Sequence, residues 1–283
     1  MLLRIAGMTI SLSSADPSLV PRAGDPAARF VIAGNGPADL DLSIERVAVM
    51  PERSGTQLFD SGAVWSMFDD GARLRIDCHS HLFGDAPYKV AFFDRDFTAG
   101  RVLLRADVFD GAVDALEYPL DEVIVAHLLA RGRGVELHAC GIIDAEGRGR
   151  LFVGQSGMGK TTTARLWLDA EDVEVVSDDR VIVREVGGRW RMFGTPWHGE
   201  AALSSPASAP LEAIYLLQQA PGTRLADVAP SEAAARLFAC TFPLFHDGSA
   251  LAFTLECIER LVASVPVRVL EFAPDRSAVE AVR

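Results

Sequence analysis

Four residues near the middle of the chain have the types and the spacing that bind phosphate. Gly154, Gly159, Lys160 and Thr161 fill the fixed positions of the motif G-x-x-x-x-G-K-[ST]. Glycines let backbone N–H groups approach an anion closely, and a helix that begins at the loop directs its positive end toward the same place. We therefore expect the loop to hold the phosphates of a nucleotide, with the contacting residues Gly154, Gln155, Ser156, Gly157, Met158, Gly159, Lys160, Thr161 and Thr162.

The residues on either side of this loop supply the context that the motif needs. Residues 151–153 are an apolar run typical of a buried strand, and residues 162–170 are compatible with a helix. The Lys160 ammonium would then reach the outer phosphates of ATP, and the Thr161 hydroxyl would bind Mg²⁺. A chance glycine-rich turn is the alternative, and the complete motif between a strand and a helix favours the phosphate site.

Two adjacent aspartates follow the next predicted strand. Asp178 and Asp179 come directly after the run 173–177. Neighbouring side chains on an extended chain point to opposite faces, so both carboxylates reach the phosphates only if the chain bends there. We expect Asp178 to hold Mg²⁺ and Asp179 to take a proton from an attacking hydroxyl, although the two roles could be exchanged. A solvated Asp-Asp turn is the alternative.

Three further polar residues are candidates for the site. His138 lies centrally in the apolar run 135–143, where its imidazole could donate to charge developing on a transferred phosphoryl group or could be a hydrogen-bonded core residue. His198 and Glu200 follow a Gly-Thr-Pro turn, and polar groups on such loops often line sites. We assign both to the acceptor side, where Trp197 could either pack or form a wall against a ligand.

Residues from about 135 to 184 resemble the catalytic domain of HPr kinase/phosphorylase, a bacterial serine kinase that shares its fold with phosphoenolpyruvate carboxykinases. The resemblance lies in His138, the loop 154–161 and Ser177-Asp178-Asp179-Arg180. It implies that the loop binds ATP with Mg²⁺, that the histidine lies near the transferred phosphate and that the acid pair contains the catalytic base. The family's Glu-Ile-Arg signature after the acid pair is missing, and residues 194–200 are more similar to divergent HPr-kinase-like proteins often associated with modified-peptide biosynthesis.

The sequence that must position these groups divides into two regions. Residues 1–118 alternate short β-like runs with turn formers such as Gly34-Asn35-Gly36-Pro37 and Asp110-Gly111, which predicts a mostly β N-terminal domain. A predicted helix over 119–131 marks the boundary, and residues 119–283 form the predicted ATP-binding domain. We expect a mixed α/β (α+β) protein, in which a P-loop domain of the carboxykinase and HPr kinase type follows a smaller β domain of possible use in acceptor recognition.

The pattern of apolar residues and turn formers predicts the remaining elements of the chain. In the first region, the predicted strands are 29–33, 40–50, 74–78, 88–93 and 101–108. In the second region, the predicted strands are 135–143 in a hairpin with 151–153, 173–177, 181–184 in a hairpin with 190–193, 211–218 and 267–272. The predicted helices there are 162–169, a helix through Ala239 capped by Ser231, 249–264 and 277–283.

Composition excludes several classes of protein. With 49% hydrophobic and 23% charged residues, the 283-residue chain is an ordinary globular protein, and a net charge of -12 argues against a nucleic-acid partner. No apolar run is long enough to span a membrane and no cleavage pattern follows the N-terminus, so we expect no membrane partner and a cytoplasmic location. The four cysteines form no CxxC pair, as expected of reduced thiols.

These observations favour an ATP-dependent kinase that phosphorylates a Ser or Thr hydroxyl of a small protein or peptide. One alternative is a carboxykinase-like or small-metabolite kinase of the same fold, although no His-plus-Lys metal pair is recognisable. Another is a nucleotide-gated binding module without transfer, against which the acid pair argues because a sensor needs no base. The sequence leaves open the acceptor, a reverse phosphorylase reaction, GTP or pyrophosphate in place of ATP, and a homo-oligomeric state.

Overall fold

The computed structural model describes residues 1–62, 64–109, 111–170 and 172–283, so the turn expected at Asp110 lies outside the described residues. The chain divides into two compact units, Met1–Leu128 and Leu129–Arg283. Helix α1 (Leu120–Leu129) therefore groups with the first unit, whereas the sequence boundary at 118/119 assigned it to the second. The reason lies in its packing, because the ring of His127 stacks on Phe97 of the first unit at a centroid distance of 4.0 Å.

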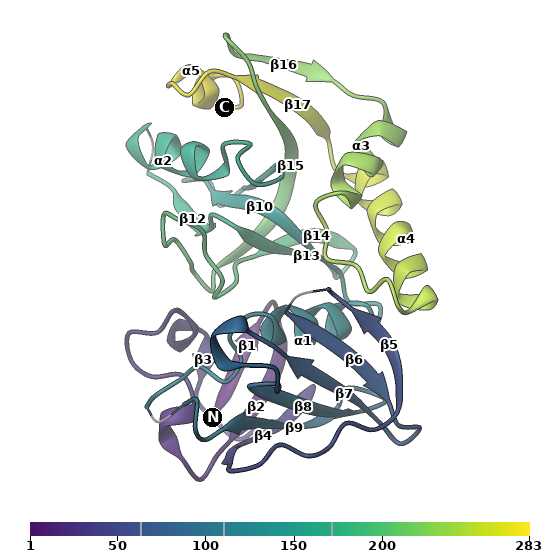
Figure 1. Ribbon diagram of the computed structural model, residues 1–283. Coiled ribbons are helices and arrows are strands. Elements are labelled where there is room, and N and C mark those ends of the chain that lie inside the picture. The colour runs from purple at the N-terminus through teal and green to yellow at the C-terminus, as the bar shows by residue number, and fades with distance from the viewer. Residues whose placement is uncertain (63, 110, 171) are drawn as a thin grey trace. The chain divides into compact units, whose positions relative to one another are not determined.

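The described part of the first unit is built on a nine-stranded sheet with the order β3-β1-β2-β4-β9-β8-β7-β6-β5 (Figure 1). Its strands are β1 (Leu2–Ile5), β2 (Met8–Ser13), β3 (Val31–Ile32), β4 (Leu40–Val47), β5 (Thr56–Asp60), β6 (Trp65–Asp69), β7 (Arg73–Cys78), β8 (Lys89–Asp94) and β9 (Ala99–Arg105). Strand β4 pairs in parallel with β2 and with β9, and the other pairs are antiparallel.

Short 3₁₀ helices interrupt this sheet at η1 (Pro17–Leu19), η2 (Pro26–Phe30) and η3 (His81–Phe83). The strand predicted over 29–33 is wrong for its first two residues, which belong to η2. Pro26 stands at the start of η2, where its fixed φ suits a helical turn, and Phe30 at its end is buried. The chain becomes extended only at β3.

The second unit is built on an eight-stranded sheet whose main path is β11-β10-β13-β14-β15-β17-β16, with β12 paired to β10. Its strands are β10 (Val135–Ile143), β11 (Gly149–Val153), β12 (Glu174–Ser177), β13 (Arg180–Val186), β14 (Arg189–Phe193), β15 (Ser208–Gln219), β16 (Arg224–Asp227) and β17 (Val267–Phe272). Both predicted hairpins, β10 with β11 and β13 with β14, are confirmed as antiparallel pairs. An additional parallel pairing of β11 with β15 connects the two ends of the run β11-β10-β13-β14-β15.

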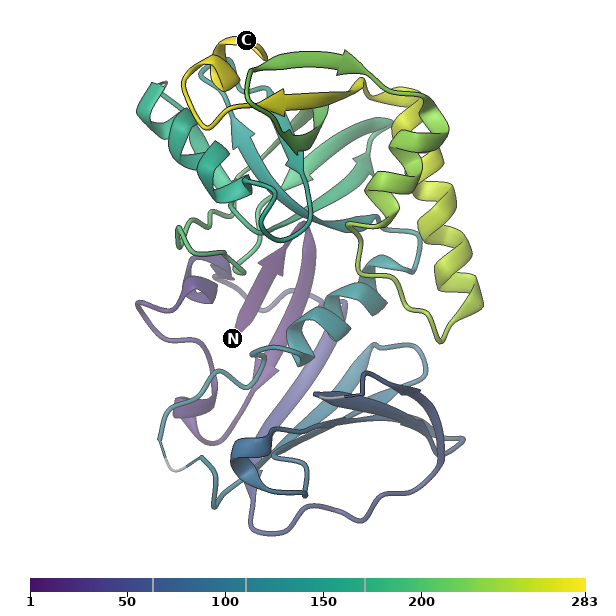
Figure 2. The ribbon, with the colours of Figure 1, turned by 45° about the horizontal axis from the view of Figure 1, so that its top comes forward.

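Helices cover both faces of this second sheet (Figure 2). Side chains alternate along β11: Phe152 packs with Trp167 of α2, while Leu151 and Val153 pack with residues such as Leu237 of α3. A strand buried on both faces is apolar throughout, which explains the continuous run before the glycine-rich loop. The helices are α2 (Lys160–Ala170), α3 (Pro230–Phe238), α4 (Gly248–Ser264) and α5 (Ser277–Glu280).

Two helix ends differ from the prediction. Ala229 rather than Ser231 occupies the cap position of α3, and Pro230 begins the helix, as its fixed φ and missing N–H favour. Helix α5 ends at Glu280, three residues before the predicted end at 283. The chain as described is a mixed α and β protein with two mixed sheets.

Candidate functional site

The glycine-rich loop joins the end of β11 to the start of α2. Strands β11, β15 and β17 run in parallel, so their carboxyl ends share one edge of the sheet, where open α/β sheets usually bind ligands. Gly157 and Gly159 have φ values of 81° and 100°, which glycine adopts without strain. A Cβ on Gly159 would also lie 2.6 Å from Cζ of Phe272. The glycines are therefore required by the path of this loop.

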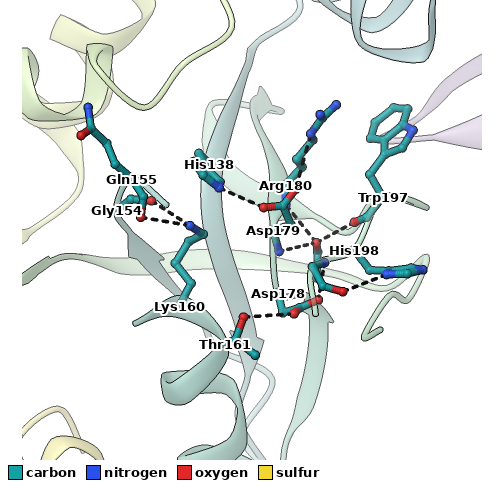
Figure 3. A network of polar contacts seen from close by, with 12 residues as sticks. His138, Gly154, Gln155, Lys160, Thr161, Asp178, Asp179, Arg180, Trp197 and His198 are labelled. Carbon is teal, nitrogen blue, oxygen red and sulfur yellow. Dashed lines mark hydrogen bonds and ion pairs between the residues drawn. The ribbon is translucent and has the colours of Figure 1, made fainter. Parts of the chain in front are cut away.

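Lys160 spans the loop from the first turn of α2 (Figure 3). Its Nζ donates to the carbonyl oxygens of Gly154 at 3.0 Å and Gln155 at 3.3 Å. The side chain is buried, and this burial lowers the pKa of Lys160. The ammonium is thus already directed across the loop at the position where an anion would offset the cost of burying it.

The Asp179 carboxylate contacts two basic side chains, which come from neighbouring strands. Nε2 of His138 on β10 lies 2.9 Å from Oδ1 of Asp179, and Nε of Arg180 lies 3.6 Å from Oδ2. The hydrogen bond to His138 is the main reason that the pKa of Asp179 lies below its ordinary value, and the charges of Arg180 and Lys160 lower it further. Figure 3 shows the ring of His138 directed toward this carboxylate.

Asp178 has a different environment, although it is the next residue. Its carboxylate is 1% exposed and accepts hydrogen bonds from the backbone N–H groups of Gly199 at 2.8 Å, Ala201 at 3.0 Å and Leu203 at 3.4 Å. The Thr161 hydroxyl donates to it at 3.4 Å. Asp178 therefore fixes the loop 199–203 against the start of α2, and the two aspartates face different partners, as alternation along an extended chain requires.

Thr161 and Asp178 fit the requirements of Mg²⁺. This ion usually takes one or two protein oxygens together with water and substrate phosphates rather than a full protein cage. The described residues contain no group of three or more His, Cys, Asp or Glu side chains that could hold a metal ion. The close approach of the Thr161 hydroxyl to Asp178 would place the ion at the start of α2, beside the glycine-rich loop.

The acceptor-side candidates lie on the loop that Asp178 fixes. His198 and Glu200 are both exposed, and Nδ1 of His198 lies 3.0 Å from the Gly199 carbonyl oxygen. Among the contacts of the described residues, none joins either side chain to Asp179. The structure therefore brings His138, Lys160, Thr161 and the acid pair together, and leaves His198 and Glu200 at the surface nearby.

Several supporting residues were not recognised from the sequence. The Cζ atom of Arg180 lies 5.9 Å from the ring centroid of Trp197 and 5.0 Å from that of Phe242. The Ser177 hydroxyl accepts from the N–H groups of Asp179 and Arg180 and donates to the Trp197 carbonyl. A serine before an acid pair is a local signal that could have been noticed, whereas Phe242 follows α3 and nothing near it in sequence indicates its place.

A cavity of about 540 Å³ borders the second half of the glycine-rich loop. It is lined by Gly159 and Thr162 at the start of α2 and by residues at the ends of β15 and β17, among them Gln219 and Phe272. Nε2 of Gln219 donates to the Gly157 carbonyl at 2.8 Å, which ties the cavity wall to the loop. The loop therefore opens directly onto a space large enough for a small ligand.

Comparisons with known proteins supply no relative for this chain: no protein-family model and no curated protein matches it. Within residues 1–62, 64–109, 111–170 and 172–283, no helix combines the length and the apolar composition that crossing a membrane requires.

Proposed function

We propose that this protein is an ATP-dependent phosphotransferase of the P-loop type found in HPr kinase and the carboxykinases, with a Ser or Thr hydroxyl of a peptide or small protein as acceptor. The observation that carries the proposal is the pairing of a buried lysine in a glycine-rich loop with an ionised aspartate held by a histidine. The Lys160 ammonium donates to the Gly154 carbonyl oxygen, and the Gly154 N–H donates to the His138 carbonyl oxygen. The side chain of His138 in turn contacts Asp179. A cation for phosphate and a base for a hydroxyl thus occupy one site.

Each group has a role in the transfer. The acceptor oxygen forms a bond to the γ-phosphorus while the bond from that phosphorus to the bridging oxygen of ADP breaks, and ADP leaves with the electron pair. The hydroxyl proton goes to the Asp179 carboxylate, which His138 orients through the 2.9 Å contact. A base of low pKa suffices because phosphoryl transfer passes through a loose transition state and depends mainly on position and charge.

The remaining residues bind the nucleotide. Lys160 and the N–H groups of the loop hold the phosphates, and the base of the nucleotide enters the cavity beside Gly159 and Thr162. Thr161 and Asp178 would hold Mg²⁺, which neutralises phosphate charge when bound. A carboxykinase-like or small-metabolite activity would use the same groups with another acceptor.

The experiment is to incubate the purified full-length protein with γ-labelled ATP, Mg²⁺ and panels of peptides, small proteins and metabolites. Label transferred to a peptide or protein hydroxyl, and lost with Asp179→Asn, is the expected result. Transfer to a metabolite would support the alternative acceptor. ATP binding without transfer to any acceptor or to water would indicate a nucleotide-gated binding module instead.

The first unit is the part that we propose selects the acceptor. Its edge strand β5 is largely exposed, with Leu58 42% accessible, and an extended peptide can add to an edge strand through backbone hydrogen bonds. Removal of residues 1–128 should then leave ATP affinity within a few-fold of the full chain while abolishing transfer to the peptide or protein acceptor. Full acceptor turnover by residues 129–283 would contradict acceptor selection, and an insoluble fragment would show that the first unit instead covers the second.

A further inference from the structure

A second cavity, of about 250 Å³, borders the first half of the glycine-rich loop. Gly154, Gln155 and Met158 form its wall on the loop side, and Arg236 and Cys240 approach from α3 and the residues that follow it. Arg236 carries the one charge among the lining residues that the structure describes. The cavity is otherwise mostly apolar, so the guanidinium is the group that would determine which ligand atoms enter it.

The end of α3 is fixed to the strand that carries His138. The His138 N–H donates to the Cys240 carbonyl at 2.7 Å, and Thr241 forms a β-bridge with Leu137. Arg236 stands in the last turn of α3, one turn before Cys240. Its position relative to the His138–Asp179 pair is therefore set by backbone hydrogen bonds rather than by a mobile loop.

Arg236 keeps much of its hydrogen-bonding capacity. Its Nη2 lies 3.4 Å from the Leu217 carbonyl oxygen and its Nη1 lies 3.6 Å from Oε1 of Glu232, both long for strong hydrogen bonds. The side chain is 29% exposed. A guanidinium has five N–H donors in a planar fork that matches phosphate oxygens, so these two contacts leave room for a phosphoryl group.

The positive charges of Arg236 and Lys160 both influence the Cys240 thiol beside the loop. Burial raises the pKa of the Cys240 thiol, while the positive charges of Lys160 and Arg236 lower it. The geometry agrees, because Lys160 donates to the carbonyl oxygens of Gly154 and Gln155, and both of these residues line the cavity that Arg236 enters. Two cations that border one cavity can stabilise a multiply charged anion there.

The positions of the two cavities indicate which way a nucleotide would lie along the loop. One borders Gly159 and Thr162 in the second half of the loop, and the other borders Gly154 and Gln155 in the first half. With the base in the larger cavity, a triphosphate that runs along the loop presents its terminal phosphoryl group to the smaller one. Resting on the proposed function, we infer that Arg236 is a second phosphate-binding cation, which contacts the terminal phosphoryl group of ATP and stabilises the charge on it during transfer.

The test compares the affinities of the full-length protein for ATP and ADP with Mg²⁺ by calorimetry, because only ATP carries the group that Arg236 would contact. Arg236→Ala should weaken ATP binding about tenfold or more and leave ADP binding within about twofold. Arg236→Lys, which keeps the charge and loses the fork, should fall between wild type and Arg236→Ala. Arg165→Ala is the matched control, since Arg165 is an exposed arginine of α2 that lines neither cavity, and both affinities should stay unchanged.

Turnover provides the second measurement. Arg236→Ala should lower the rate of phosphoryl transfer by about 10²- to 10³-fold, and added guanidinium should restore part of it. Equal weakening of ATP and ADP, or unchanged ATP affinity, would overturn the inference while leaving the proposed function intact. A wild-type protein that binds ATP without transfer would contradict the proposed function, and the ATP-to-ADP ratio would still decide the role of Arg236. Absence of binding to either nucleotide would overturn both.

Discussion

Asp77 of the first unit and Lys160 of the second unit are both buried charges, and their surroundings differ. In the first unit, Asp77 is fully buried and accepts from Nε of Arg75 at 2.6 Å and Nε of Arg53 at 3.0 Å. Arg75 also donates to the carbonyl oxygens of Pro51 and Glu52, so the network satisfies itself. In the second unit, Lys160 donates only to carbonyl oxygens within the described chain.

On the proposed function, the difference is that between a structural charge and one that binds a ligand. A buried carboxylate that is bonded to a buried guanidinium neutralises its own neighbourhood and has no use for a ligand. The ammonium of Lys160 is hydrogen-bonded to uncharged carbonyl oxygens, and those of Gly154 and Gln155 belong to residues that line a cavity. An anion in that cavity would offset the cost of burying the charge. Burial alone therefore does not identify a site, whereas the charge balance of the buried groups does.

The largest effect should come from Lys160→Ala. Removal of the ammonium deletes the cation nearest to the phosphates, so phosphoryl transfer should fall by roughly 10³-fold or more and ATP affinity should fall with it. Because the variant no longer buries an ammonium, its free energy of unfolding should equal that of the wild type or exceed it slightly. Transfer assays, calorimetry and urea denaturation check the three parts, and wild-type turnover in this variant would remove the central assignment.

Asp179→Asn should cut transfer by about 10² to 10⁴ and leave ATP affinity nearly unchanged, because the amide cannot accept the hydroxyl proton. Asp178→Asn should instead raise the Mg²⁺ concentration needed for half-maximal rate and increase hydrogen exchange of the loop 199–203, whose N–H groups the carboxylate accepts. The two variants should therefore differ in phenotype, one in the rate of transfer and the other in its Mg²⁺ requirement. Reversal of these phenotypes would exchange the two roles, and normal transfer by both variants would place the base elsewhere.

Asp77→Asn tests the structural side of the comparison. Loss of this carboxylate leaves Arg75, which is 3% exposed, without its buried counter-charge, and breaking such a pair typically costs about 3–5 kcal/mol. Denaturation by urea should show this loss, while the remaining folded protein should bind ATP with wild-type affinity. Arg165→Ala again serves as a control for loss of an exposed charge. A fall in ATP affinity without a fall in stability would show that the two kinds of buried charge are not separate.

The parts of the site that could be predicted from sequence are those encoded by local pattern. The glycine-rich loop, the hairpin of β10 and β11, and the aspartates at the end of β12 each depend on residues close together in the chain. The different environments of Asp178 and Asp179 could not be predicted, because that of Asp178 depends on N–H groups of residues 199–203. An acid pair in a sequence does not indicate which carboxylate a distant loop will bury.

Long-range pairing accounts for the other differences. Phe242 and Arg236 reach the site because the chain after α3 bonds to β10, a contact between segments about a hundred residues apart that no periodicity reveals. Helix α1 was assigned to the wrong unit for a related reason. Its apolar residues and its terminal Pro and Gly predict a helix, and they do not say which sheet will cover it.

The smallest expected effect is a shift in pH dependence on replacing His138. The hydrogen bond from His138 is the main cause of the low pKa of Asp179, so His138→Ala should raise that pKa toward the value of a free aspartate. Transfer requires the ionised carboxylate, and the acid limb of the turnover profile should therefore move to higher pH.

The stabilisation from the depressed pKa of Asp179 is fully present above about pH 4, the unfolded value, and is lost as the pH falls through the folded value. The stability deficit of His138→Ala should accordingly be full at neutral pH and shrink below about pH 4, as measured by urea denaturation at a series of pH values. In an Asp179→Asn background both shifts should vanish, and an acid limb that stays in place in the single variant would show that His138 does not control the base.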